Sequence, residues 1–197
     1  MSIRLRDPLP LFAAGALLYV AAAAVCVTVI KGDALTVMEL LVPLFGLPFV
    51  LLGHGPRWRT ALYLLLLVPA FHYLAVLAAV SSLDGMGRTR ILPPGAIGGL
   101  LGATLSFLAL AALRLARRRV VVTMIAGIVV LGLLGHFGVQ EMDFLSGTRW
   151  SGYDLLLSLY LPWQLAFGFF LSRLLRLQDQ EASADAPGAC PKPPGAP

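Results

Sequence analysis

Apolar residues occupy six long stretches of the chain, and few charged residues interrupt them. A helix that crosses the hydrocarbon core of a bilayer needs about 20 consecutive, mainly apolar residues. The stretches that meet this requirement cover about residues 9–30, 34–53, 61–80, 91–113, 120–138 and 152–172. This pattern predicts an all-α polytopic membrane protein, a bundle of six transmembrane helices joined by short connections.

The composition agrees with a membrane location. Hydrophobic residues make up 58% of the 197-residue chain and charged residues 13%, whereas soluble domains contain about 25% charged residues. Too few polar residues remain to cover a water-soluble core of this size. The net charge is +5, but the basic residues are dispersed among the connections, so we expect no nucleic-acid partner.

The two ends of the chain differ from its apolar middle. The first apolar stretch continues to Ile30, too long for the core of a cleaved signal peptide, so we interpret it as an uncleaved first span. Residues 177–197 contain five prolines and almost no large apolar residue, which predicts a disordered cytoplasmic tail after a transmembrane domain of residues 1–176. Cys26 and Cys190 lie far apart and form no CxxC pattern, so we predict no metal site and no cofactor.

Basic residues in the short connections predict the orientation, because cytoplasmic loops carry an excess of Lys and Arg. One set of connections contains ten basic residues: Arg4, Arg6, Arg57, Arg59, Arg114, Arg117, Arg118, Arg119, Arg173 and Arg176. The opposite set contains four: Lys31, Arg88, Arg90 and Arg149. This excess places both termini on the cytoplasmic side of the cell (inner) membrane, in agreement with an even number of spans.

Two short patterns recur along the chain. The sequence Leu-Leu-Gly-His occurs at residues 51–54 and again at 133–136, and Pro69 and Pro162 lie within the third and the sixth predicted span. These matches suggest a duplicated unit of three spans. Because three is an odd number, the two halves are then inverted relative to each other, a 3+3 arrangement found in many transporters. The alternative is coincidence, since Leu, Gly and Pro are abundant in this chain.

Ionisable side chains inside the predicted spans are candidate site residues, because each must be paired or face water. Glu39, His72, His136 and Asp154 come from four different spans and fall in the outer half of the membrane. Together they suit a proton relay, a cation site or an outward-facing cavity for a basic solute. The alternative is a structural role, in which Asp154 is favoured by the dipole of a nearby helix start and His136 is an interfacial residue.

Gln164 is a further candidate substrate- or ion-binding residue. It lies close to Pro162, and a proline within a helix leaves the carbonyl four residues earlier without its usual donor. Pro43, Pro48 and Pro69 have the same effect in the second and third spans. Helices interrupted in this way line binding sites in transporters, although prolines also produce simple kinks between packed helices.

Closely spaced glycines mark the fourth span as a packing surface. Gly95 with Gly99, and Gly98 with Gly102, form two overlapping pairs with three residues between their members. This spacing allows another helix backbone to approach closely. The approaching helix is either a neighbour in the same bundle, or a second copy of the chain or another partner.

No motif identifies a reaction, because the chain contains no glycine-rich phosphate loop, no GxSxG and no HExxH. The first function that remains is a small transporter, a channel or a membrane-embedded transport subunit, which the candidate repeat favours. The second is a non-catalytic assembly or scaffold subunit of a membrane complex. The third is an intramembrane enzyme for a lipid or isoprenoid, with His72 and Glu39 as base and acid. The absence of an HxxxH or DxxD pair argues against the enzyme. The expected partners are the lipid bilayer and either a second copy or a larger membrane complex.

Overall fold

The protein is described by a computed structural model that covers residues 8–29, 39–52, 58–84, 93–113, 120–145 and 156–184. Every regular element among these residues is a helix, which confirms the all-α prediction. In chain order the elements are α1 (Pro8–Val29), α3 (Pro43–Leu52), α4 (Trp58–Leu62), η1 (Tyr63–Leu67), α5 (Val68–Asp84), α6 (Pro94–Ala112), α7 (Val121–Leu145), η3 (Leu156–Tyr160) and α9 (Leu161–Ala184). The elements η1 and η3 are single π-helical turns that continue directly into α5 and α9.

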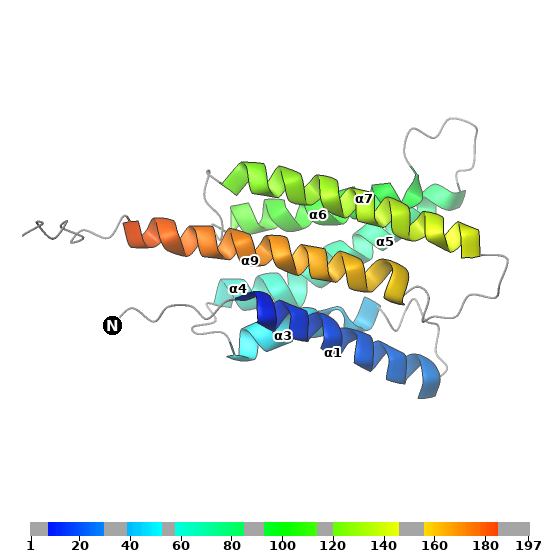
Figure 1. Ribbon diagram of the computed structural model, residues 1–197, viewed down its shortest axis with the longest axis horizontal. Helices are drawn as coiled ribbons and strands as arrows, with labels where there is room; N and C mark the ends of the chain where they lie inside the picture. Colours follow the sequence, from blue (N-terminus) through cyan, green and yellow to red (C-terminus); the bar gives the residue numbers. More distant parts are fainter. Residues whose placement is uncertain are drawn as a thin grey trace, which may run out of the picture.

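The helices form a ring in which neighbours in the sequence are also neighbours in space. Helix α1 packs against α3, α3 against η1, α5 against α6, α6 against α7, and α7 against α9. The contact between α9 and α1 closes the ring. Figure 1 shows the long helices side by side, with the start of α1 and the end of α9 toward the same end of the bundle.

Four helices are long and apolar enough to cross a membrane: Pro8–Cys26, Trp58–Ser82, Pro94–Ala112 and Val121–Gly138. They fall in four of the six predicted spans. Helix α9 occupies the predicted sixth span but also contains polar residues such as Gln164 and Arg173, and it is not one of the four. It continues to Ala184, beyond the predicted end of the transmembrane domain at residue 176.

The predicted second span is a short apolar helix, Glu39–Leu52. Its 14 residues extend only about 21 Å, compared with about 30 Å for the hydrocarbon core of a bilayer. The six-span count and the inverted repeat therefore stay predictions.

The surface of the bundle is apolar, as expected for contact with lipid. Large hydrophobic side chains are strongly exposed on several helices, with Val122 at 77%, Leu40 at 74%, Leu17 at 63% and Leu108 at 59%. The hydroxyl groups of Thr28, Ser82 and Ser172 bond to the backbone of their own helices, as when Ser172 Oγ donates to the carbonyl of Phe169 at 2.8 Å. Such bonds remove the need for water beside an apolar phase.

Aromatic side chains fill the interior of the ring. Five buried phenylalanines come from four helices: Phe12, Phe45, Phe49, Phe107 and Phe167. Their ring centroids are 5.0–5.9 Å apart in four successive contacts that run from Phe49 to Phe107, distances typical of stacked or tilted aromatic pairs. We call this group the aromatic plug.

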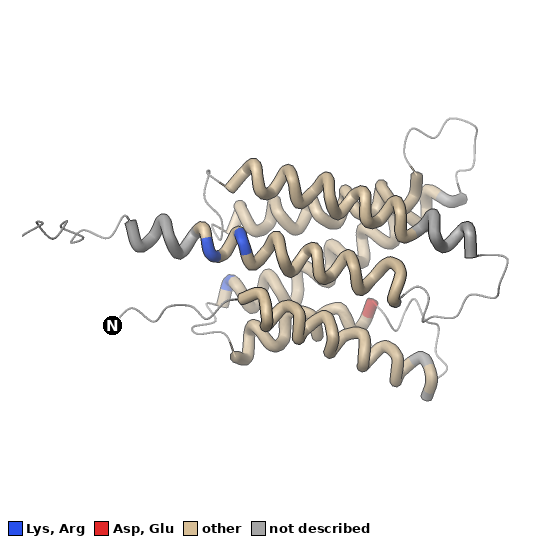
Figure 2. The backbone as a smooth tube through the Cα atoms, viewed as in Figure 1, with Lys and Arg blue, Asp and Glu red and all other residues tan. Residues whose placement is uncertain are grey.

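The described charges divide the bundle into two ends. The basic residues whose side chains the structure describes are Arg59, Arg173 and Arg176, and Glu39 is the corresponding acidic residue. Figure 2 shows the basic positions gathered at one end and the acidic position displaced toward the other. We call the first the basic end.

Candidate functional site

Glu39 lies where the backbone of the second helix is irregular. Residues 39–41 are helical, the chain turns at Val42, and α3 begins at Pro43. Pro43 has no N–H to donate to the carbonyl of Glu39, which is four residues earlier. That carbonyl accepts a hydrogen bond from the N–H of Val42 instead, at 3.3 Å. The proline therefore accounts for the interruption that follows the half-buried Glu39.

Two tyrosines from distant parts of the chain lie close to Glu39. Tyr19 comes from α1 and Tyr160 ends η3, and their ring centroids are 6.2 Å apart. The carboxylate of Glu39 interacts electrostatically with both phenol groups. Tyr19 is fully buried and Tyr160 is 3% exposed. Two separate elements thus place tyrosines beside Glu39, so three parts of the chain meet here.

His72 adds a fourth element to this group. Its imidazole centroid lies 5.3 Å from the ring of Tyr160 and 5.9 Å from that of Trp163. The Nε2 atom is buried and has no hydrogen-bond partner within the protein. We call Tyr19, Glu39, His72 and Tyr160 the Glu39 cluster, because every other member is linked to Glu39 directly or through Tyr160.

Gln164 follows Tyr160 by one turn on the same helical face, since residues four apart are neighbours on a helix. It is 3% exposed, and its Oε1 atom is buried with no hydrogen-bond partner within the protein. Unpaired polar atoms at such depth are rare and costly, and they are typical of sites that take a ligand or water. Gln164 is therefore a buried polar residue one helical turn from Tyr160 of the Glu39 cluster.

Trp163 connects the Glu39 cluster with the aromatic plug. Its ring contacts His72 on one side and stacks on Phe167 of the plug, with 5.3 Å between the centroids and 15° between the planes. Phe167 is buried, whereas Phe169 on the same helix is 44% exposed. The Glu39 cluster, whose tyrosines also pack against Ala23 and Val42, and the aromatic plug thus form two layers that meet at one tryptophan.

Two helices of the cluster contain a π-helical turn followed by a proline. Both η1 and η3 end two residues before a proline, Pro69 and Pro162 respectively. In η1 the N–H of Val68 donates to the carbonyl of Tyr63, five residues earlier, so the helix widens just before Pro69. Such widening reduces the clash between a proline ring and the preceding turn. His72 follows the first proline by less than one turn, and Gln164 follows the second by two residues.

The remaining predicted site residues do not join the Glu39 cluster. The described ring contact of His136 is with its neighbour Phe137, at 5.2 Å, and its buried Nδ1 atom has no hydrogen-bond partner within the protein. Asp154 lies outside the described residues. Their roles in ligand binding stay predictions.

The four glycines of the fourth predicted span all pack inside the bundle. A Cβ atom added to Gly99 would lie 2.5 Å from the carbonyl oxygen of Leu131 on α7, and one added to Gly135 of α7 would overlap the carbonyl of Gly95. On the other side of α6, Gly98 and Gly102 contact Ala75 of α5. The described part of the chain thus uses both glycine pairs for close contacts between its own helices.

The sequence interpretation missed Tyr19 and Tyr160. Both lie within long apolar stretches, where a tyrosine is difficult to distinguish from any other aromatic core residue. The feature that could have identified them is the hydroxyl group, because a buried tyrosine hydroxyl needs a hydrogen-bond partner. The hydroxyl of Tyr19 has no such partner within the protein. Tyr63 shows the limit of this signal, since its hydroxyl is also buried and unpaired although it belongs to the apolar core.

Among the described residues, no three His, Cys, Asp or Glu side chains gather as they do around a metal ion. The described chemistry is that of one carboxylate, two phenols and one imidazole, a set suited to holding a proton or a small cation. No protein-family model, no curated protein and no solved structure matches this chain at a significant level.

Proposed function

We propose that this protein is a small membrane transporter, or the membrane-embedded subunit of a transport system, that moves protons or a small cation through the Glu39 cluster. The observation that carries the proposal is the convergence of four polar side chains from four parts of the chain inside an apolar bundle. Buried polar groups cost free energy unless they are satisfied. Within membrane helices they mark ion pathways and proton relays.

The aromatic plug gives this site one closed side. Phe12 lies near the start of α1 and Phe49 near the end of α3, so the plug lies closer to the basic end than the Glu39 cluster does. Tyr19 is seven residues beyond Phe12 on α1, which separates the two layers by about 10 Å. A polar site that is closed on one side by aromatic rings suits alternating access, in which the plug opens after the site has closed toward the other face.

A 3+3 inverted duplication is part of the proposal, and the helix crossings support it. A Cβ atom added to Gly15 on α1 would overlap the carbonyl oxygen of Phe45, which Gly46 follows. A Cβ atom added to Gly99 on α6 would overlap the carbonyl of Leu131, which Gly132 follows. The two crossings are thus alike. In each proposed half, a glycine of the first helix contacts the backbone of the second helix, and the residue it contacts is followed by a glycine.

The π-helical turns give a second parallel between the halves. The two turns and their prolines are separated by the same 93 residues, as Tyr63 is from Leu156 and Pro69 from Pro162. The ring of contacts also agrees with a two-fold relation. Such a relation exchanges α1 with α6 and α5 with α9, so the contact of α1 with α9 corresponds to that of α6 with α5, and both contacts are present. These parallels favour an inverted pair of three-helix units with the Glu39 cluster formed between them.

The repeated Leu-Leu-Gly-His does not fit this alignment. If Phe45 corresponds to Leu131, then Leu51 corresponds to Phe137 rather than to Leu133. The two copies are therefore displaced by about one helical turn, and the support for duplication comes from the crossings and the prolines.

The scaffold function loses its proposed binding face, because the glycines of α6 contact α5 and α7. The enzyme function has support from neither a described metal site nor a catalytic motif. Transport is the function for which a carboxylate within the bundle, interrupted helices and a duplicated architecture are all expected.

The test is a flux assay with purified protein in liposomes. Vesicles with and without protein are given an imposed membrane potential, and the uptake of H⁺, Na⁺, K⁺ and guanidinium is followed separately. The proposal predicts that the protein accelerates at least one of these fluxes above that of protein-free vesicles. The proposal would be contradicted if folded and inserted protein left the fluxes of all four ions equal to those of protein-free vesicles.

A further inference from the structure

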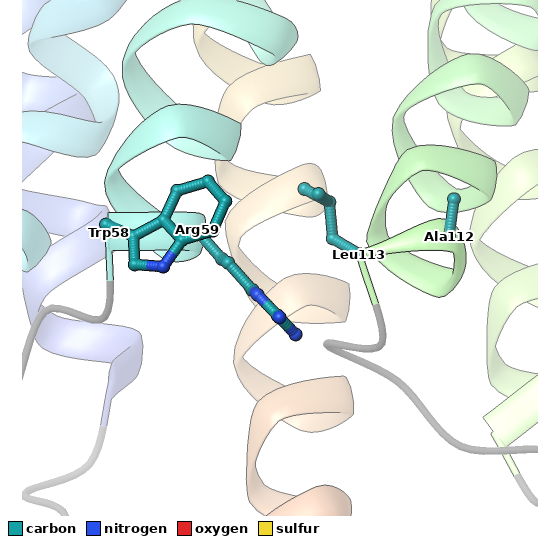
Figure 3. Close-up of a pocket in the computed structure, with 4 residues that line it drawn as sticks. All are labelled: Trp58, Arg59, Ala112 and Leu113. Atoms are coloured by element: carbon teal, nitrogen blue, oxygen red, sulfur yellow. The ribbon is translucent and has the colours of Figure 1, made fainter.

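A second candidate site lies at the basic end of the bundle. A cavity of about 280 Å³ opens between the first turn of α4 and the last turn of α6, and Trp58, Arg59, Ala112 and Leu113 line it. Figure 3 shows the ring of Trp58 beside the side chain of Arg59, which extends downward from α4 on the side that faces Leu113. None of these residues belongs to the Glu39 cluster or to the aromatic plug.

The lining combines one cation with an apolar wall. The Arg59 guanidinium lies 5.6 Å from the centroid of the Trp58 ring, and both residues are exposed. Of the side chains that the structure describes, no carboxylate shares this end, since Glu39 lies toward the other. Arginine presents a planar fork of donors that matches the oxygens of a phosphate. Ala112 and Leu113 offer apolar contact on the opposite wall.

The position of Trp58 indicates the depth of the cavity in the membrane. Its ring is 68% exposed, and exposed tryptophans of membrane proteins gather at the level of the lipid headgroups. A cavity of about 280 Å³ has room for several water molecules. A glycerol phosphate group, with about ten non-hydrogen atoms, is therefore of suitable size.

We propose that this cavity binds the headgroup of an anionic glycerophospholipid, such as phosphatidylglycerol, from the leaflet that surrounds the basic end. Arg59 pairs with the phosphate, Trp58 lies at headgroup level, and Ala112 and Leu113 contact the glycerol and the first atoms of the acyl chains. Basic pockets between membrane helices bind anionic headgroups in this manner. A zwitterionic lipid brings an ammonium group close to Arg59 and is therefore bound less well.

The test is a lipid competition with the full chain. Protein is reconstituted in nanodiscs of phosphatidylcholine that contain a minor fraction of phosphatidylglycerol with the same acyl chains, and native mass spectrometry measures the lipids that it retains. Wild-type protein is expected to enrich phosphatidylglycerol, and Arg59→Gln to reduce that enrichment about fivefold. Arg173→Gln removes the same charge from the same end at a residue that does not line the cavity, and is expected to preserve the enrichment. Thermal unfolding in phosphatidylcholine alone verifies that both variants fold.

Three results would overturn the proposal. The first is a lack of enrichment by wild-type protein. The second is an equal loss in the two variants, which would mean a general attraction to the basic end. The third is tight binding of inorganic phosphate or glycerol phosphate without lipid, with the same dependence on Arg59, which would identify a soluble anion as the ligand.

Discussion

The imidazole of His72 packs against the phenol ring of Tyr160, with 5.3 Å between the ring centroids and 52° between the planes. The two residues are 88 positions apart and belong to the third and sixth predicted spans. Each lies within a few residues of the proline in its own span. Because Tyr160 also interacts electrostatically with Glu39, this contact brings the two interrupted helices together at the Glu39 cluster.

Removing single tyrosine hydroxyl groups tests whether a tyrosine has a functional role or only a packing role. Tyr160→Phe keeps the ring contact with His72 but removes the group that interacts with Glu39, so we expect the flux to fall about tenfold with little change in stability. Tyr63→Phe is the matched control, because the hydroxyl of Tyr63 is buried and unpaired outside the cluster. It should preserve the flux and leave the protein as stable as wild type or more so. Equal fluxes in the two variants would remove Tyr160 from the site.

The close crossing of α6 and α7 predicts a sharp difference between two glycines. In Gly99→Ala the new methyl group lies 2.5 Å from the backbone oxygen of Leu131, so the helices must separate. We expect a loss of about 1–3 kcal/mol in unfolding free energy. Gly102→Ala brings a methyl group within 3.0 Å of the Ala75 side chain, a milder conflict, and should cost less. Thermal unfolding in detergent measures both, and an equal or smaller loss for Gly99→Ala would mean that this crossing is looser than described.

The aromatic plug predicts a leak when one of its rings is removed. Phe167 contacts Phe45, Phe107 and Trp163, so Phe167→Ala opens a space at the centre of the apolar layer. It should cost about 3–5 kcal/mol of stability and raise the passive proton permeability of vesicles at neutral pH. Phe169→Ala removes the same ring from a position that is 44% exposed and should leave the permeability unchanged. If the two variants leak equally, the plug does not close the pathway.

The orientation is testable with single cysteines in a background of Cys26→Ser and Cys190→Ser. Thr28 lies at the end of α1 away from the basic end, and Ala112 lines the cavity at the basic end; both are exposed. In intact cells, Thr28→Cys should react with a membrane-impermeant maleimide added from outside. Ala112→Cys should react only after the membrane is opened. The reverse pattern would place the basic end outside the cell.

Much of the fold was predictable from the hydrophobic pattern, because a membrane helix must be both long and apolar. Helices α1 and α6 coincide with their predicted spans for this reason, and α7 begins with its predicted span but continues beyond residue 138 to Leu145. The second span was harder to predict, since the effect of Pro43 on the carbonyl of Glu39 depends on local geometry. The apolar average over 34–53 does not contain that information.

The candidate site was predictable only in part. Glu39, His72 and Gln164 stand out because ionisable and amide groups are rare within spans. Tyr19 and Tyr160 did not, because their rings match the apolar residues around them and only tertiary contacts reveal the role of their hydroxyl groups. His136 was expected, like His72, in the outer half of the membrane, yet its described ring contact is with Phe137, because depth in the membrane does not determine which way a helix face points.

The decisive measurement compares the initial flux through wild-type protein and Glu39→Gln. Both are reconstituted at equal density, and the probe is whichever of H⁺, Na⁺, K⁺ and guanidinium the wild type moves fastest. Glutamine has nearly the same shape but neither charge nor a titratable proton. If the Glu39 cluster carries the ion, the rate falls about tenfold or more, while Glu39→Asp restores part of it and the unfolding temperature stays close to that of wild type. Equal rates for wild type and Glu39→Gln would show that the ion does not pass through this cluster.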